Sequence, residues 1–301
     1  MTFRADYHVH PDFSVDADGT IDEYCGRALD IGLNEICFTT HFDLCPERLA
    51  TDGFVCVEGQ RVPVTSDWLP RYLDAIEAAK EEWGRRLTVR AGLETDYLPV
   101  IEGQLHAILE GPLGRRLDFV MGSVHCLDGL ALTLSAEGAE LFRRHGEKGV
   151  LDTYYDLMAG AVESRLFDAI GHFDIYRKCR SWNGDGSGGD DDLFGPAAGL
   201  AEPVFRRMAE LGCGLEVNTA PFRRGIKDTF PGARLLALAR RCGVQVATTG
   251  SDCHHPSVLG RGLDLATERL VEAGFDAVYT FQQREPRAHL LAPELEKQRQ
   301  D

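Results

Sequence analysis

The 301-residue sequence has no long apolar run and no excess of basic residues. No stretch approaches the roughly 18 consecutive apolar residues that a transmembrane helix needs, and the first residues do not form a basic and then apolar leader. Lysine and arginine number 32 against 48 acidic residues, which gives a formal net charge of −16. Proteins that bind a nucleic-acid backbone usually carry a basic patch, and none is evident. We therefore expect a cytoplasmic protein with neither a membrane nor a nucleic acid as partner.

The nine cysteines are odd in number, and no two of them form a Cys-x-x-Cys pair. This scattered spacing favours reduced, structural thiols over a disulfide framework. The sequence also has no internal repeat and no interdomain linker. Apolar residues make up 44% of the chain and charged residues 27%, a usual mixture for a globular protein. We expect a single domain that covers residues 1–301.

Short apolar runs alternate with longer amphipathic segments along the chain. Strands are expected at residues 4–9, 35–40, 87–93, 117–123, 167–171, 214–217, 244–249 and 276–281. Helices are expected at residues 20–32, 67–84, 99–111, 150–165, 196–212, 231–243 and 256–274. This alternation predicts a parallel α/β fold, and about seven or eight units favour a closed barrel over an open sheet. Two loops interrupt it: residues 43–66, long enough for a lid, and the Gly-rich, acidic residues 181–192.

Two histidines, His8 and His10, lie one residue apart in the first expected strand, within DYHVHPDFSVD. Alternate residues of a strand point to the same face, so both imidazoles would project together. Imidazoles arranged in this way are a candidate metal site. Taken alone, the pattern fits equally well a strand that carries two polar side chains.

Further histidines and acidic residues follow the ends of five more expected strands. They are His41, Glu94, His125, His172, Asp252 and His254, and Asp16 lies in the loop after the first strand. In a (β/α) barrel the carboxyl ends of the strands converge on one face, where active sites are built. Capping of strands by hydrogen bonds would explain one such histidine, but six of the ten histidines lie at these ends. Imidazole and carboxylate ligands suit Zn²⁺, Fe²⁺ or Mn²⁺, and a set of this size suits two or three ions.

The motifs HVH, GLETDY, GSVH, GHFD and GSDCHHP, in this order, resemble the PHP (polymerase and histidinol phosphatase) metallohydrolase family. More narrowly, GLETDYLP, DFVMGSVHCLDG, HFDIYRK and LEVNTAPFR are similar to the monofunctional histidinol-phosphate phosphatases of that family. The resemblance covers residues 5–281 and implies a distorted (β/α)7 TIM-like barrel with a trinuclear metal centre. It implies that the first ion is held by His8, His10, Glu94 and Asp252, the second by Glu94, His125 and His172, and the third by Asp16, His41 and His254.

The resemblance also implies hydrolysis of L-histidinol phosphate to L-histidinol and phosphate, a step of histidine biosynthesis. We expect Glu94 to hold two cations, with Asp252 beside it, and a hydroxide bridging the cations to attack phosphorus. His255 or a metal-bound water would protonate the leaving alkoxide.

Several residues near the expected strand ends are candidates for substrate binding. Arginine suits phosphate because its planar fork donates two hydrogen bonds at once. Candidates for the phosphate are Arg177, Arg223 and Arg261, with Asn218 and Thr219 as further donors. Candidates for the ammonium and imidazole of histidinol are the acidic residues Asp43, Asp128 and Glu216.

The sequence leaves three alternatives open. In the first, the same site serves a different small phosphomonoester, such as a nucleotide, a sugar phosphate or phosphotyrosine. A metal-dependent amidohydrolase typically carries a carboxylated lysine on a strand, and no lysine ends an expected strand here. The third alternative is a non-catalytic metal-binding module. Residues 130–149 and 181–192 depart from the family pattern and flank the expected mouth, so they are where substrate choice would differ.

Overall fold

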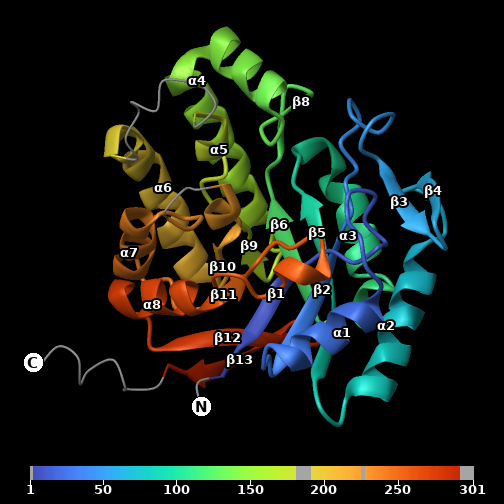
Figure 1. Ribbon diagram of the computed structural model, residues 1–301. Coiled ribbons are helices and arrows are strands. Elements are labelled where there is room, and N and C mark those ends of the chain that lie inside the picture. The colour runs from blue at the N-terminus through green and yellow to red at the C-terminus, as the bar shows by residue number, and fades with distance from the viewer. Residues whose placement is uncertain (1–2, 181–190, 225–227, 292–301) are drawn as a thin grey trace, which may run out of the picture.

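A seven-stranded parallel barrel forms the centre of the computed structural model, which describes residues 3–180, 191–224 and 228–291 (Figure 1). Its strands, in spatial order, are β1 (Ala5–Val9), β2 (Glu35–His41), β5 (Thr88–Asp96), β6 (Phe119–Ser123), β9 (Ala169–Ile170), β10 (Gly214–Asn218) and β11 (Ala247–Gly250). Between β11 and β1 the barrel is nearly closed: Val9 bridges Cys253 in parallel, and the His10 N–H donates to the Cys253 carbonyl at 3.0 Å. The expected distorted (β/α)7 barrel is therefore confirmed.

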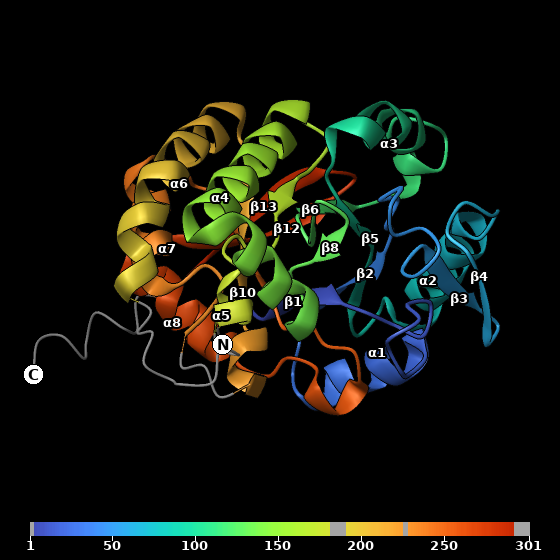
Figure 2. The same cartoon turned by 90° about the horizontal axis from the view of Figure 1, so that it is seen from above.

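Helices surround these strands, as the view from above shows (Figure 2). They are α1 (Ile21–Asp30), α2 (Leu69–Trp83), α3 (Glu102–Leu109), α4 (Ser135–Ser164), α5 (Arg177–Arg180), α6 (Asp191–Leu211), α7 (Ala233–Arg241) and α8 (Leu263–Ala273). Helix α1 begins with a capping box, in which Thr20 and Glu23 bond to each other's backbone N–H groups. No helix among the described residues is long and apolar enough to cross a membrane.

A β-bulge in β1 divides the interior of the barrel into two levels. The register of β1 against β2 shifts between Asp6 and Val9, where three residues of β1 span two of β2. Such a bulge turns two consecutive side chains to the same side. Tyr7 and His8 consequently both face the interior of the barrel. Tyr7 packs at the lower level, in a cluster with Phe119 and Phe281, and His8 lies in the polar level above it.

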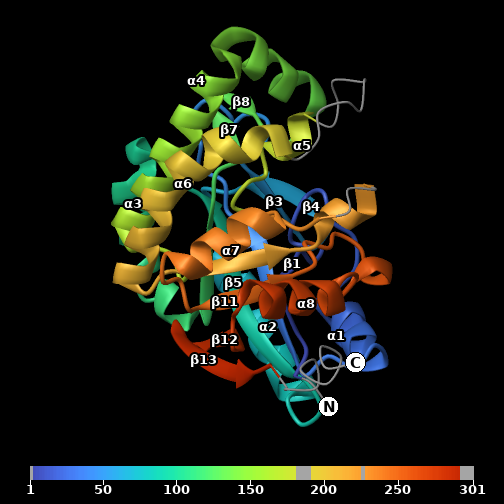
Figure 3. The same cartoon turned by 90° about the vertical axis from the view of Figure 1, so that its left-hand side faces the viewer.

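The lower end of the barrel is closed by an antiparallel hairpin of β12 (Ala277–Gln282) and β13 (Glu285–Leu290) (Figure 3). The sequence predicts a strand at 276–281, and the structure has one there, but it pairs with β13 and does not enter the barrel. Phe281, 2% exposed, packs from this hairpin against the aromatic rings inside the barrel. The eighth strand is thus part of a lid on the lower end.

Three other expectations differ from the structure. Residues 43–66 contain a hairpin of β3 (Phe54–Val57) and β4 (Gln60–Pro63), and are not loop throughout. The expected helix at 256–274 is divided into a 3-10 turn at Pro256–Val258 and α8, because Gly260 and Gly262 adopt φ values of 70° and 91°. Helix α4 begins at Ser135, fifteen residues earlier than expected, and bends at Gly146.

The segment after β6 makes a second short hairpin at the upper end, formed by β7 (Cys126–Leu127) and β8 (Leu130–Ala131). Its turn residues, Asp128 and Gly129, both have positive φ values, 46° and 72°. This is the conformation that an Asp-Gly pair favours in two-residue hairpin loops. The hairpin lies beside the beginning of α4 and forms part of the upper rim. The expected loop at 181–192 lies largely outside the described residues.

Candidate metal centre

Four ligand-type side chains meet at the upper, carboxyl end of the strands. Glu94 Oε2 lies 3.0 Å from His8 Nε2 and 3.4 Å from His10 Nε2. Asp252 Oδ1 lies 3.7 and 3.5 Å from the same two nitrogens. Ligand atoms about 2.1 Å from one ion in a tetrahedral arrangement are about 3.4 Å apart. The four atoms therefore have the spacing expected around a single ion.

The other oxygen of Glu94 faces a second group of imidazoles. Glu94 Oε1 lies 2.8 Å from His172 Nε2 and 3.4 Å from His125 Nε2, and these two nitrogens are 3.0 Å apart. Ser123 donates its hydroxyl to the same oxygen at 2.7 Å. Glu94 is thus shared between two groups of ligand atoms, one for each carboxylate oxygen.

A third group is wider and more open to solvent. Asp16 Oδ2 lies 3.4 Å from His254 Nε2 and 3.9 Å from His41 Nε2. The ring of His10 stacks between those of His41 and His254, 4.2 Å from each. The Asp16 side chain is 56% exposed, whereas the Glu94 side chain is 1% exposed. All nine side chains that the sequence assigns to metal therefore lie in one cluster.

The protonation states in this cluster suit a divalent cation. His10 Nε2 is buried and has no hydrogen-bond partner among the described residues. Burial lowers the pKa of His10 well below its usual value, and the neighbouring His254 and His41 act in the same direction, so its imidazole is neutral. Burial works to raise the pKa of Glu94, but His8 and His125 hold it well below its usual range.

Burial works to lower the pKa values of His8 and His125, but Glu216 and Glu94 raise that of His8 well above its usual value, and Asp96 and Glu94 raise that of His125 to about 10. These two imidazoles therefore carry protons that a bound cation would displace. Imidazole and carboxylate ligands together are a donor set for Zn²⁺, Fe²⁺ or Mn²⁺.

Two carboxylates behind the cluster orient the imidazoles. Glu216 Oε1 lies 2.7 Å from His8 Nδ1, and its other oxygen accepts the His172 backbone N–H at 2.7 Å. Asp96 Oδ1 lies 2.9 Å from His125 Nδ1 and accepts the backbone N–H of the same residue. These contacts leave the Nε2 atoms directed at Glu94, an arrangement common behind metal-binding histidines.

The position of Glu216 depends on a close approach between strands. A Cβ atom on Gly250 of β11 would lie 2.2 Å from Glu216 Oε1 and 2.5 Å from the His8 Cβ. Only glycine therefore leaves room for the Glu216–His8 contact. The sequence interpretation of Glu216 as an acid on the pocket rim is wrong, because its side chain is fully buried. Asp96 was not singled out from the sequence, although Glu94-x-Asp96 places both side chains on one face of β5.

The cluster forms the floor of a cavity with two lobes. One lobe, of about 290 Å³, is lined by residues that include Asp43, Asp52, Asp96 and Arg48. The other, of about 230 Å³, is lined by residues that include Arg223 and Lys178. The two lobes share the side chains of Asp16, Ile175, Lys178, Asp252 and His254. Outside the cluster, the acidic lining residues all lie in the first lobe, which we call the acidic lobe. The charged residues that line the second lobe outside the cluster are Lys178 and Arg223, and we call it the basic lobe.

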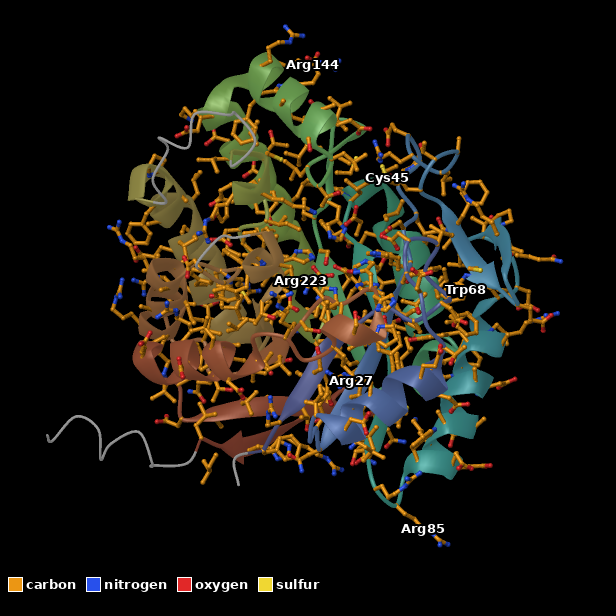
Figure 4. The ribbon with its side chains drawn as sticks, viewed as in Figure 1. Arg27, Cys45, Trp68, Arg85, Arg144 and Arg223 are labelled. Atoms are coloured by element: carbon orange, nitrogen blue, oxygen red, sulfur yellow. The ribbon has the colours of Figure 1, made fainter. Side chains whose placement is uncertain are left out.

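Among the arginine candidates, Arg223 lies at the cavity (Figure 4). Its guanidinium donates to the carbonyls of Ser251 and Asp252, the latter at 2.6 Å. Arg223 therefore brings positive charge to the basic lobe and also orients the segment that carries Asp252. Lys178, which follows Arg177 in the sequence, lines both lobes, and nothing in the sequence distinguished it from the arginine before it.

Arg177 and Arg261 lie away from the cavity. Arg177 is 8% exposed and donates to Asp174, Asp228 and the Thr229 carbonyl, so it ties the end of β9 to the segment before α7. Arg261 is exposed on the α8 side, and its described hydrogen bonds are made by its backbone: its N–H donates to the Val258 carbonyl at 3.2 Å and its carbonyl accepts from Thr219. Their positions do not support the prediction that these two arginines bind phosphate.

His255 also lies away from the cavity. It is exposed and caps the 3-10 turn that follows it, since its Nδ1 accepts the Ser257 backbone N–H at 3.1 Å. The expected role of His255 as general acid is therefore not supported. Asp128 pairs with His145 at 3.0 Å on the hairpin rim.

Asn218 and Thr219 bond to the protein itself. Asn218 donates to both oxygens of Glu216 at 3.2 Å, and its own carbonyl oxygen accepts the Ala220 N–H. Thr219 donates to the Arg261 carbonyl at 2.7 Å. Asp43 lines the acidic lobe, with Oδ2 3.9 Å from His41 Nδ1. Of the candidates for substrate binding, Asp43 and Arg223 are thus the two that reach the cavity.

Known proteins match this chain over most of its length. The probable histidinol-phosphatase of Deinococcus radiodurans is 31% identical over 94% of this chain and 98% of its own length. The histidinol-phosphatase of Lactococcus lactis is 22% identical over 92% of this chain and 94% of its own. A crystal structure of the Lactococcus lactis enzyme, complexed with Zn, L-histidinol and phosphate, superimposes with a TM-score of 0.76, covering 95% of this chain and all of the other.

The family comparison rests on a large part of the chain. The PHP domain model matches residues 6–220, which contain seven of the nine ligand-type side chains in the cluster. The remaining two, Asp252 and His254, lie beyond the match but within the same cluster. The chain therefore belongs to the PHP domain family.

Proposed function

We propose that this protein is a metal-dependent phosphomonoesterase that hydrolyses L-histidinol phosphate to L-histidinol and phosphate. The observation that carries the reaction class is the shared carboxylate of Glu94. Its two oxygens face two separate groups of imidazole nitrogens, 2.8–3.4 Å away. Paired metal sites of this kind serve phosphoester hydrolysis. The relatives named above, whose lengths match this chain throughout, support histidinol phosphate as the substrate.

We assign the ligands as three groups, for two to three ions of Zn²⁺, Fe²⁺ or Mn²⁺. They are His8, His10, Glu94 and Asp252 for the first, Glu94, His125 and His172 for the second, and Asp16, His41 and His254 for the third. When bound, such ions act as Lewis acids toward phosphate oxygens and make water more acidic. Glu216 and Asp96 keep the imidazoles of His8 and His125 in the ligating orientation.

The charges of the two lobes match the two ends of histidinol phosphate. Lys178 and Arg223 provide positive charge at the basic lobe, where a phosphate dianion would be stabilised. Asp43 and Asp52 lie in the other lobe, where the ammonium and imidazole of the alcohol would be placed. Burial and the neighbouring Asp96 raise the pKa of Asp43, and a bound cation would favour its ionised form. The substrate would thereby bind in one orientation.

Among the described strands, none carries a lysine, so the carboxylated lysine typical of an amidohydrolase has no counterpart. The complete set of nine ligand-type side chains also argues for catalysis over a metal-binding module. A different small phosphomonoester is the alternative that the experiment must separate.

The test is phosphate release by metal-analysed protein from L-histidinol phosphate, AMP, p-nitrophenyl phosphate and a phosphotyrosine peptide. We expect two to three metal equivalents per chain and a kcat/KM for L-histidinol phosphate at least about 100-fold above the others, since a buried polar site discriminates strongly against alcohols that lack its partners. Turnover of another ester alone would overturn the substrate assignment and leave the reaction class. Absence of hydrolysis by the metal-loaded protein would overturn both.

A further inference from the structure

A nearly buried arginine joins two walls of the acidic lobe. Arg48 lies between β2 and β3 and is 7% exposed. Its Nε donates to Asp52 in the same segment, and its Nη1 donates to Glu137 at 2.6 Å and to the Gly129 carbonyl at 3.0 Å. Glu137 also accepts the backbone N–H of Ala131 at 2.7 Å. One guanidinium thus connects the segment after β2, the β7–β8 hairpin and the first turn of α4.

Two of these segments, the one after β2 and the β7–β8 hairpin with the residues that follow it, line the acidic lobe. The first turn of α4 stands behind the hairpin and carries Glu137. The segment after β2 contributes Asp43, Cys45, Arg48 and Asp52 to the lining, and the opposite side contributes Cys126 and Ala131. Cys45 Sγ and Cys126 Sγ lie 3.6 Å apart where the two sides meet (Figure 4 labels Cys45). The Arg48 contacts therefore span the lobe wall at a distance from the metal centre.

We infer that Arg48 is a positioning residue that fixes the two walls of the acidic lobe and thereby sets the preference for the alcohol part of the substrate. This inference rests on the proposed phosphomonoesterase function. Arg48 bonds to none of the nine ligand-type residues; its described side-chain partners are Asp52, Glu137 and Gly129. We therefore expect a substitution of Arg48 to change the placement of the substrate and to leave the binding of the ions unchanged.

Hydrogen bonds from the charged guanidinium of Arg48 hold the two sides of the acidic lobe at a fixed separation. A guanidinium presents several donors in a rigid plane, so three acceptors from separate segments are held at fixed relative positions. Asp52, one of these acceptors, lines the lobe, so Arg48 also fixes a carboxylate beside the expected position of the substrate cation. A misplacement of about 1 Å in such a wall is enough to cost a large factor in substrate use.

The experiment measures kcat and KM separately for L-histidinol phosphate and p-nitrophenyl phosphate, whose alcohol is uncharged. For Arg48→Met we expect KM for L-histidinol phosphate to rise about tenfold, with kcat within about twofold and metal content as in the wild type. The kcat/KM ratio of the two esters should fall by a similar factor of about ten. Arg48→Lys keeps the positive charge but not the planar guanidinium, so its KM should lie between those of the wild type and Arg48→Met.

A second variant and a matched control separate positioning from general destabilisation. Glu137→Gln should reproduce part of the KM increase. The double variant with Arg48→Met should be no worse than Arg48→Met alone, because Arg48→Met already removes the contact with Glu137. Arg143→Met is the control, since Arg143 pairs with Glu140 on the exposed side of α4 and is 72% exposed. This variant should hydrolyse both esters with the kcat and KM of the wild type.

Equal losses for both esters, or losses in kcat alone, would overturn the inference. If the Arg48 variants do not fold, Glu137→Gln gives the same KM-against-kcat comparison. If the wild-type protein hydrolyses a different ester, the proposed substrate is wrong. The inference about Arg48 is then tested separately, by comparing the kcat/KM ratio of that ester to p-nitrophenyl phosphate in Arg48→Met and in the wild type.

Discussion

The two ends of this barrel are built from the same strands and have opposite chemistry. At the lower end, Tyr7, Phe119 and Phe281 fill the interior with aromatic rings, and the β12–β13 hairpin covers them. At the upper end the interior is lined by histidines and carboxylates. The bulge in β1 marks the change, since Tyr7 belongs to one level and His8 to the other. The lower level supplies stability, and it supports an upper level that is costly to bury.

The largest expected effect is a loss of activity on substitution of a residue at the upper end. Glu94→Gln removes the shared anionic carboxylate, so we expect hydrolysis to fall by about 1,000-fold or more and bound metal to fall with it. The measurements are phosphate release and metal analysis of the purified variant. Wild-type activity with full metal content in this variant would contradict the assignment of Glu94.

The converse experiment is made at the lower end. Phe281→Ala leaves a cavity beside Tyr7 and Phe119, so we expect the free energy of unfolding to fall by about 3–5 kcal/mol. Denaturant titration measures this loss. Activity per folded molecule should stay close to that of the wild type, because no contact of Phe281 reaches the ligand-type residues. A variant of normal stability that has lost its metal would contradict the division into two levels.

A smaller effect is expected from the carboxylates that stand behind the ligands. Asp96→Asn replaces the anion that faces His125 Nδ1 at 2.9 Å, so the affinity of the second group for metal should fall by about 10- to 100-fold. Metal titration in competition with a chelator measures it. Asp118→Asn is the matched control, because Asp118 is equally buried but accepts backbone N–H groups of Ala91 and Gln283 at the lower end.

The smallest expected effect is a pH dependence of the lower end. Burial lowers the pKa of His289, which stacks on Phe3 at 3.5 Å, below its usual value of about 6.5. A histidine with a depressed folded-state pKa stabilises the fold above its unfolded pKa, and this contribution is lost as the pH falls through the folded value. His289→Phe should therefore make stability less sensitive to pH below about 6.5. Unfolding curves of the wild type and the variant, from pH 5 to 8, measure the difference.

Much of the upper end could be predicted from the sequence because the rule involved is local. Residues at the carboxyl ends of barrel strands converge on one face of the barrel. The strand boundaries alone therefore predict that His41, Glu94, His125 and His172 lie together. The fold followed from the same alternation of strands and helices. His8 and His10 still lie side by side, with ring centroids 4.9 Å apart, although the register of β1 shifts between Asp6 and Val9.

The residues that the sequence did not place depend on distant neighbours. Arg177 and Lys178 are adjacent, and the short helix α5 decides that Lys178 lines the cavity while Arg177 bonds to Asp174 and Asp228. The inward position of Glu216 depends on the lack of a side chain at Gly250, thirty-four residues later. The β3–β4 hairpin turns at Glu58 and Gly59, a weaker sequence signal than Asn-Gly or Asp-Gly.

The seam between β1 and β11 has a consequence for how the protein is made. His8 and His10 are synthesised more than 240 residues before Asp252, which follows β11, and the backbone N–H of Ser251 reaches back 245 residues to Asp6. A growing chain that has not yet reached β11 lacks one side of the first group of ligand atoms. The complete centre is consequently assembled only after β11 and Asp252 have been translated. A chain that stops before β11 cannot assemble the complete centre.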